Sequence, residues 1–149
     1  MFALRMSGGV LTLILAATPS LAQQPSPAGH VKIVSGSAFI VRQNATVPAR
    51  AGEPVFATDA LRTGVDGTVG VTLNDDTRLS LGSSSEVRLE RYVYAPGEGG
   101  FGMVLKFVRG VAAYVSGRMA KLAPDSIHLE TPAAIVGVRG TTVAVRVEP

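Results

Sequence analysis

The stretch that decides the fold spans residues 131–145 and reads T-P-A-A-I-V-G-V-R-G-T-T-V-A-V. Gly137 and Gly140 stand on either side of Arg139, so the backbone can take positive φ values around one charged residue. An apolar, β-branched run comes before the turn, and residues 141–147 then alternate between two faces, one of them rich in valine. Locally, the pattern is that of an ordinary glycine-rich hairpin, a turn between two strands.

The N-terminus has the features of an export signal. Arg5 supplies a positive charge, residues 10–17 form a short apolar core, and Ser20 and Ala22 place small side chains before a cleavage site. An uncleaved N-terminal anchor is the alternative interpretation. After cleavage we expect no segment that spans a membrane. We therefore expect three segments: a signal peptide (residues 1–22), a flexible leader (23–29) and one domain (30–149).

Charge and cysteine content exclude some classes of protein. The 149-residue chain has a formal net charge of +3 and no cysteine. Its lysines and arginines occur singly, without the basic runs and interleaved aromatic residues of a nucleic-acid groove, so we do not expect a nucleic-acid partner. Disulfides cannot stabilise the domain, and packing has to hold it.

Alternating apolar residues predict strands along most of the domain. One face collects Val69, Val71 and Leu73, and the same spacing recurs in later segments. These are Leu79 and Leu81; Val87, Leu89 and Val93; and Met103, Leu105 and Phe107. Arg109-Gly110 is expected to end a strand, with a separate short strand over 111–115, and residues 117–124 have room for one helical turn. The chain is therefore expected to be all-β, with short antiparallel strands in a sandwich, barrel or β-helix.

A five-residue pattern occurs twice. Residues 64–68 read G-V-D-G-T and residues 137–141 read G-V-R-G-T, which indicates either a repeated turn type or a true structural repeat. We expect the turn residues to serve the fold, Arg139 included, because its side chain can pack its stem over apolar surface and bond carbonyl groups. The predicted structural residues are Gly64, Gly67, Gly137, Arg139, Gly140 and Thr141.

Two longer motifs frame the domain. The first combines G-E-P-V (52–55), D-A-L-R-T-G (59–64), V-G-V-T-L (69–73), D-T-R-L-S-L (76–81) and S-E-V-R-L (85–89). The second is the 131–145 stretch, and R-G-V at 109–111 lies between them. Together these motifs resemble the FecR domain family over nearly the whole predicted domain. The resemblance implies a FecR-like β-sandwich or β-helix-like fold and a periplasmic or secreted location in a Gram-negative-type envelope.

The sequence departs from the family pattern in two respects. Asp75-Asp76-Thr77 replaces the usual Asp-Gly-Thr, which removes the glycine and predicts a different turn type. The best-known members are inner-membrane regulators with a cytoplasmic sigma-factor-binding segment and a spanning helix, and we expect neither here. The resemblance therefore implies the fold and the compartment, whereas sigma-factor regulation is not carried over.

No constellation of residues in the sequence predicts catalysis. Ser126, His128 and Glu130 would share one strand face about 6.6 Å apart, too far for a nucleophile, base and orienting group that need contact at about 3 Å. Two distant histidines and no cysteine do not predict a zinc site. Asp66 and the aspartates at 75 and 76 have oxygens that suit calcium, but turn chemistry explains them. We therefore expect no enzyme activity, no metal and no cofactor.

The favoured hypothesis is a non-catalytic binding or sensory module in envelope signalling or assembly. It would hold an envelope protein or glycan by strand addition or on a shallow face. The alternatives are a structural, adhesin-like β-module and a small hydrolase of an envelope polymer. The candidate binding surface is one strand face with polar and aromatic side chains, formed by Arg88, Glu90, Tyr92 and Tyr94.

Overall fold

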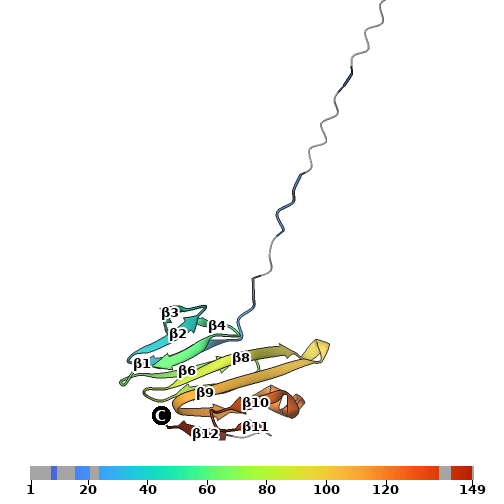
Figure 1. Cartoon of the computed structure of the whole chain (residues 1–149). Coiled ribbons are helices and arrows are strands. Elements are labelled where there is room, and N and C mark those ends of the chain that lie inside the picture. Colours follow the sequence, from blue (N-terminus) through green and yellow to red (C-terminus); the bar gives the residue numbers. More distant parts are fainter. Residues whose placement is uncertain (1–7, 10–15, 21–23, 138–141, 149) are drawn as a thin grey trace, which may run out of the picture.

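The structure is a computed structural model that describes residues 8–9, 16–20, 24–137 and 142–148. In this part of the chain the regular structure is mostly β-strand, which confirms the all-β prediction (Figure 1). The first strands are β1 (Gly29–Ser35), β2 (Ala38–Arg42), β3 (Ala45–Pro48), β4 (Pro54–Val55), β5 (Ala60–Thr63), β6 (Thr68–Leu73) and β7 (Arg78–Leu81). They are followed by β8 (Glu86–Ala95), η1 (Pro96–Glu98), β9 (Gly100–Val115), α1 (Arg118–Leu122), η2 (Pro124–Ser126), β10 (Ile127–Glu130), β11 (Ile135–Gly137) and β12 (Thr142–Val147).

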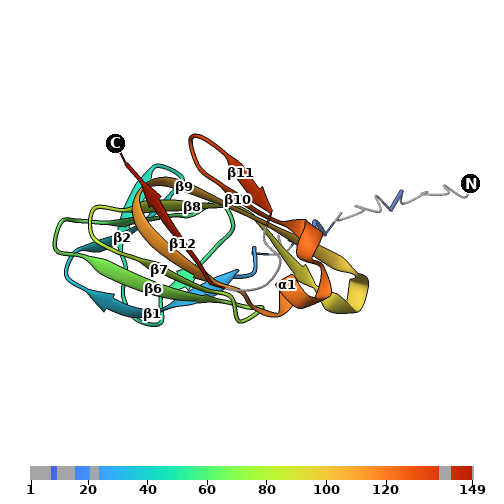
Figure 2. The ribbon, with the colours of Figure 1, turned by 90° about the horizontal axis from the view of Figure 1, so that it is seen from below.

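The strands form one curled sheet whose two layers pack against each other (Figure 2). Its main path runs β3-β2-β5-β8-β9-β7-β6-β1-β4, and every described pairing is antiparallel except that of β9 with β10. The 16-residue β9 joins the layers, because its first part pairs with β8 and β10 and its last part with β7 and β12. Gly110 takes a φ of +82° inside β9 and the strand continues past it, so the predicted strand end at this glycine is wrong.

Glycine positions mark the corner where the chain passes from one layer to the other. β1 and β2 meet at Gly36, which has a φ of +64°, and β5 and β6 meet at the turn from Gly64 to Gly67. The amide of Gly64 donates to the carbonyl of Ser37 at 2.9 Å. A Cβ at Gly67 would lie 1.8 Å from that same carbonyl oxygen, so only glycine fits. The two turns therefore touch through their backbones.

The core lies between the two layers and consists of the alternating residues that the sequence predicts. Val69, Val71 and Leu73 of β6 are buried. On β9, the side chains of Met103, Leu105 and Phe107 form a second buried row. The predicted helical turn is also present as α1, where Met119 is fully buried against the core.

A register shift in β8 changes which side chains face the core. The shift lies between Leu89 and Arg91, where β8 pairs with β9. Beyond it, Tyr92 pairs with Met103 and packs against the core, whereas Val93 is 37% exposed. The prediction that Val93 shares the buried face of Leu89 is therefore wrong, because an extra residue in a strand exchanges its two faces.

The packed domain begins earlier than the predicted boundary at residue 30. Ala28 is buried, its amide donates to the carbonyl of Val55 at 2.7 Å, and its carbonyl accepts from the amide of Asn74 at 2.8 Å. Gly29 is already part of β1. The last two residues of the predicted leader are therefore held by the domain.

The structure describes both sides of the turn within the 131–145 stretch. β11 ends at Gly137 and β12 begins at Thr142, while Arg139, Gly140 and Thr141 lie outside the described residues. β11 pairs with β10, and β12 pairs with the last part of β9. Both predicted strands exist, and among the described residues they pair with different parts of the curled sheet rather than with each other.

The turn that lacks the family glycine is built on two aspartates. Asp76 has a φ of +69°, the left-handed conformation that glycine favours. Aspartate tolerates this conformation better than most residues. The loss of the glycine therefore does not require the different turn type that the sequence predicts.

Candidate functional site

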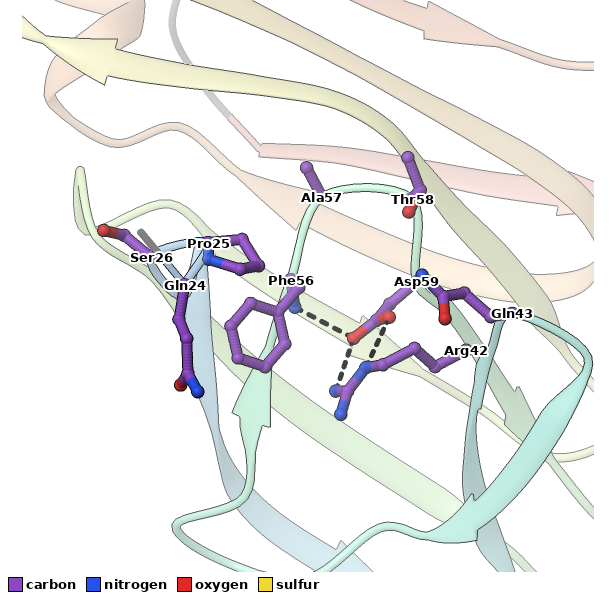
Figure 3. A pocket seen from close by; sticks show the side chains of 9 residues that line it. All are labelled: Gln24, Pro25, Ser26, Arg42, Gln43, Phe56, Ala57, Thr58 and Asp59. Carbon is purple, nitrogen blue, oxygen red and sulfur yellow. Dashed lines mark hydrogen bonds and ion pairs between the residues drawn. The ribbon is translucent and has the colours of Figure 1, made fainter. Parts of the chain in front are cut away.

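A hollow on the domain lies where the leader meets the β4–β5 connection. It has a volume of about 590 Å³ and is shown in Figure 3. Three of its walls come from different parts of the chain: residues 24–26, the end of β2 and the loop before β5. We call it the leader pocket, and its residues are Gln24, Pro25, Ser26, Arg42, Gln43, Phe56, Ala57, Thr58 and Asp59.

A half-buried ion pair holds the base of the leader pocket (Figure 3). Nε and Nη2 of Arg42 donate to the two carboxylate oxygens of Asp59 at 2.9 and 2.8 Å, and Asp59 is fully buried. Asp59 also accepts from the amide of Phe56 at 2.8 Å, and Arg42 donates to the carbonyl of Pro54 at 3.1 Å. The guanidinium lies 4.6 Å from the centroid of the Phe56 ring. The hydrogen bond with Asp59 raises the pKa of Arg42, so this cation stays charged and fixed.

The pocket as a whole is electrically neutral. Arg42 and Asp59 carry the only charges on its described walls, and each cancels the other. The remaining polar groups are the amides of Gln24 and Gln43 and the hydroxyls of Ser26 and Thr58. Such groups exchange hydrogen bonds with hydroxyls and amides of a ligand and give no preference for a charged one.

Strained backbone lies beside the pocket. Thr58 has a φ of +75°, which is unusual for a β-branched residue. Its amide donates to the carbonyl of Leu89 at 2.6 Å, so β8 holds the strained loop in place. Strain of this kind costs about 1–3 kcal/mol and is concentrated at binding sites.

A smaller hollow of about 140 Å³ adjoins the leader pocket and shares Ser26 and Ala57 with it. Tyr92 and Tyr94 line it, and the Tyr94 ring lies 6.2 Å from that of Phe101. The hydroxyl of Tyr92 lies 3.0 Å from Oδ1 of Asp75 and donates to it. Burial, and after it the Asp75 charge, raise the pKa of Tyr92 well above its ordinary value. We call this hollow the tyrosine hollow.

The structure does not bring the four predicted surface residues together on one face. Arg88 and Glu90 are exposed, and the Arg88 side chain, 51% exposed, lies 4.0 Å from Glu86. Tyr92 and Tyr94 come after the register shift and face the leader instead. The prediction that these four residues share one strand face is therefore wrong, because the register shift turns Tyr92 and Tyr94 away from Arg88 and Glu90.

Arg42 and the other leader-pocket residues were missed in the sequence. Asp59 stands in one of the quoted motifs, and Arg42 ends an apolar strand, but nothing in the sequence pairs residues 17 positions apart. A lone acid at the start of a strand and a lone base at the end of another are the only local signal.

The residues that the sequence did not favour as catalytic or metal-binding groups are placed as follows. Ser126 lies in η2, outside β10, and its hydroxyl donates to the carbonyl of Ala123 at 2.6 Å. His128 is exposed on β10. Among the described residues no group of three histidine, aspartate or glutamate side chains could hold a metal ion. Asp75 is fully buried, and both its carboxylate oxygens accept hydrogen bonds from the protein.

Fold and pocket together define an all-β domain that offers a neutral polar pocket at one end of a curled antiparallel sheet. Residues 59–149 match the family described as FecR protein, and the chain belongs to this family. No curated protein and no solved structure matches the chain. The match begins at Asp59, so Arg42 and Phe56 lie before it. No helix in the described ranges is both long and apolar enough to cross a membrane.

Proposed function

We propose that this chain is a non-catalytic binding module of the periplasm that takes part in envelope signalling or assembly. Its partner is an envelope protein or glycan, which places a neutral hydrogen-bonding group in the leader pocket. The observation that carries the proposal is the neutral pocket itself, whose one cation is already matched by a buried carboxylate. Membership of the FecR family supports a role in the envelope.

The chemistry of the pocket favours binding over catalysis. Asp59 is fully buried and its oxygens accept from Arg42 and Phe56, so it has no exposed lone pair with which to take a proton from a ligand. The remaining walls supply amides and hydroxyls without a base beside them. These groups suit sugar hydroxyls and peptide amides alike.

Two experiments on the chain without its predicted signal peptide test the proposal, one for each class of partner. The glycan test follows backbone amide resonances while chitotriose, a neutral oligosaccharide, is added. Saturable shifts at Gln43 and Phe56, lost in Gln43→Ala, would support a glycan. The protein test places a photo-crosslinking residue at position 43 in cells, with position 46 as control, because Thr46 is exposed on neighbouring β3 but outside the pocket.

A protein that crosslinks from position 43 and not from position 46 would support a protein partner. Arg42→Gln provides a second check, since it leaves Asp59 as an unpaired buried charge and should abolish either signal. The proposal is wrong if chitotriose gives no saturable shift near the pocket and the two crosslinking positions capture the same proteins.

A further inference from the structure

Another hollow, outside the leader region, is lined by several positively charged side chains. It has a volume of about 540 Å³ and lies between the end of β6, the start of β7 and the start of α1. We call it the basic groove, and its residues are Thr72, Asp76, Arg78, Ser116, Gly117, Arg118 and Lys121. The proposed function uses none of them.

Three cations and one carboxylate line the basic groove, which leaves an excess of two positive charges. Nη2 of Arg118 lies 2.9 Å from Oδ2 of Asp76, but the two side chains are 65% and 61% exposed. An ion pair this exposed contributes about 0–1 kcal/mol and opens at little cost. Arg78 and Lys121 are exposed and form no ion pair with any residue that the structure describes.

The nearby Asp75 forms no ion pair with these cations. Its carboxylate is fully buried and accepts from the hydroxyl of Thr77 at 2.7 Å, from Tyr92 at 3.0 Å and from the amide of Met119 at 3.3 Å. Only its carbonyl points toward the groove wall, where it accepts from the amide of Arg118 at 2.7 Å. The positive charges at the rim therefore have no buried counter-ion in contact with them.

Strand register places hydrogen-bonding groups beside the cations. Thr72 of β6 pairs with Arg78 of β7, so their side chains stand next to each other on the outer face of the layer. His30 of β1 pairs with Thr72 in the same row. An imidazole, a hydroxyl and a guanidinium thus lie in one row across three strands, and the last two line the groove. The hydroxyl and the guanidinium donate hydrogen bonds to anions.

We propose that the basic groove binds a phosphate group, either free or borne on a sugar. Two guanidinium groups offer planar, two-pronged donors that match phosphate oxygens, and the ammonium of Lys121 adds a third positive charge. The excess of two charges equals the charge of a phosphate dianion, whereas a carboxylate would leave one cation unmatched. On phosphate binding, Arg118 exchanges Asp76 for the ligand.

The test titrates the exported chain with inorganic phosphate at low salt and follows backbone amides and arginine Nε–H resonances. Saturable shifts are expected at Thr72, Gly117 and Arg118. Arg78→Gln and Lys121→Gln should each weaken binding at least five-fold, while Asp76→Asn should tighten it several-fold. Arg50→Gln and Lys106→Gln, which remove cations outside the groove, should change it less than two-fold.

Glucose 1-phosphate and glucose separate the possible sources of the phosphate. Tighter binding of glucose 1-phosphate than of inorganic phosphate would assign the groove to a phosphorylated glycan, and equal binding would assign it to free phosphate. Glucose alone should not shift the groove resonances. The proposal is overturned if phosphate gives no saturable shift, or if the control variants weaken binding as much as Arg78→Gln does. Thermal unfolding of each exposed-site variant checks that the fold is intact.

Discussion

At Gly67 the carbonyl oxygen of Ser37 fills the space that a side chain would need. A Cβ atom at this position would lie 1.8 Å from that oxygen, and the obstacle is backbone, which cannot rotate away. Gly64 contributes to the same contact, since its amide donates to that carbonyl. The corner of the sheet therefore depends on the absence of one carbon atom.

Gly67→Ala should lower the free energy of unfolding by about 3 kcal/mol or more, because the two turns have to separate to admit the methyl group. Gly97→Ala is the matched control, since no atom lies within 4 Å of the Cβ that it would add. Its effect should stay within about 0.5 kcal/mol. Urea unfolding followed by circular dichroism measures both variants, and equal midpoints would contradict this account of the corner.

Single residues also show where the sequence was informative. Gly64 and Gly67 stand out in a G-x-x-G pattern, and the structure uses both at the corner where the strands change layer. The register shift near Glu90 has no such signal, because no glycine or proline marks it. The alternating pattern of β8 therefore predicts the faces of the residues after Glu90 one position out of register, and it places Tyr92 on the wrong face.

At the scale of elements, hydrogen bonds to the Asp75 side chain connect the β6–β7 turn with β8 and α1. Asp75 lies in the β6–β7 turn, bonds Tyr92 of β8 and accepts from the amide of Met119 at the start of α1. It also accepts from Thr77 within its own turn. The position of the short α1, which is too short to be stable alone, therefore depends on this carboxylate.

Asp75→Ala should lower the free energy of unfolding by about 3 kcal/mol, because it leaves several buried donors without an acceptor. Asp75→Asn keeps one carbonyl acceptor and should cost less. Asp76→Asn is the control: Asp76 is 61% exposed, and asparagine tolerates its positive φ. Hydrogen exchange at Met119 should rise in Asp75→Ala only; unchanged protection there would refute the link to α1.

Element pairing was less predictable than element existence. Period-two alternation located most strands, since a half-buried strand imposes it directly. Pairing partners are not encoded locally: β11 and β12 flank one glycine-rich stretch yet join β10 and β9 respectively. The ion pair of Arg42 with Asp59 could not be predicted from the sequence either. The two residues come together only because β2 pairs with β5, and this pairing has no local signal.

For the whole molecule, the curled sheet encloses polar groups along with its apolar core. Tyr92 and Tyr114 both have side chains in this interior, and Tyr114 is fully buried. Burial is the main cause that raises the pKa of each phenol, and the negative charge of Asp75 adds to it. The folded state therefore keeps both protons at a pH where unfolded tyrosines, with a pKa of about 10, release theirs.

This difference predicts a loss of stability in alkali. Below pH 10 both states hold the protons, so the stabilisation is complete; above it the unfolded state binds fewer protons, and stability falls as the pH rises. Each tyrosine removes up to about 1.4 kcal/mol per pH unit in this range. Tyr92→Phe should be less stable at pH 8, having lost the bond to Asp75, but should lose stability more slowly between pH 10 and 11.5. Urea midpoints across this range provide the measurement, and parallel pH profiles for the variant and the natural chain would rule out Tyr92 as a source of the alkaline transition.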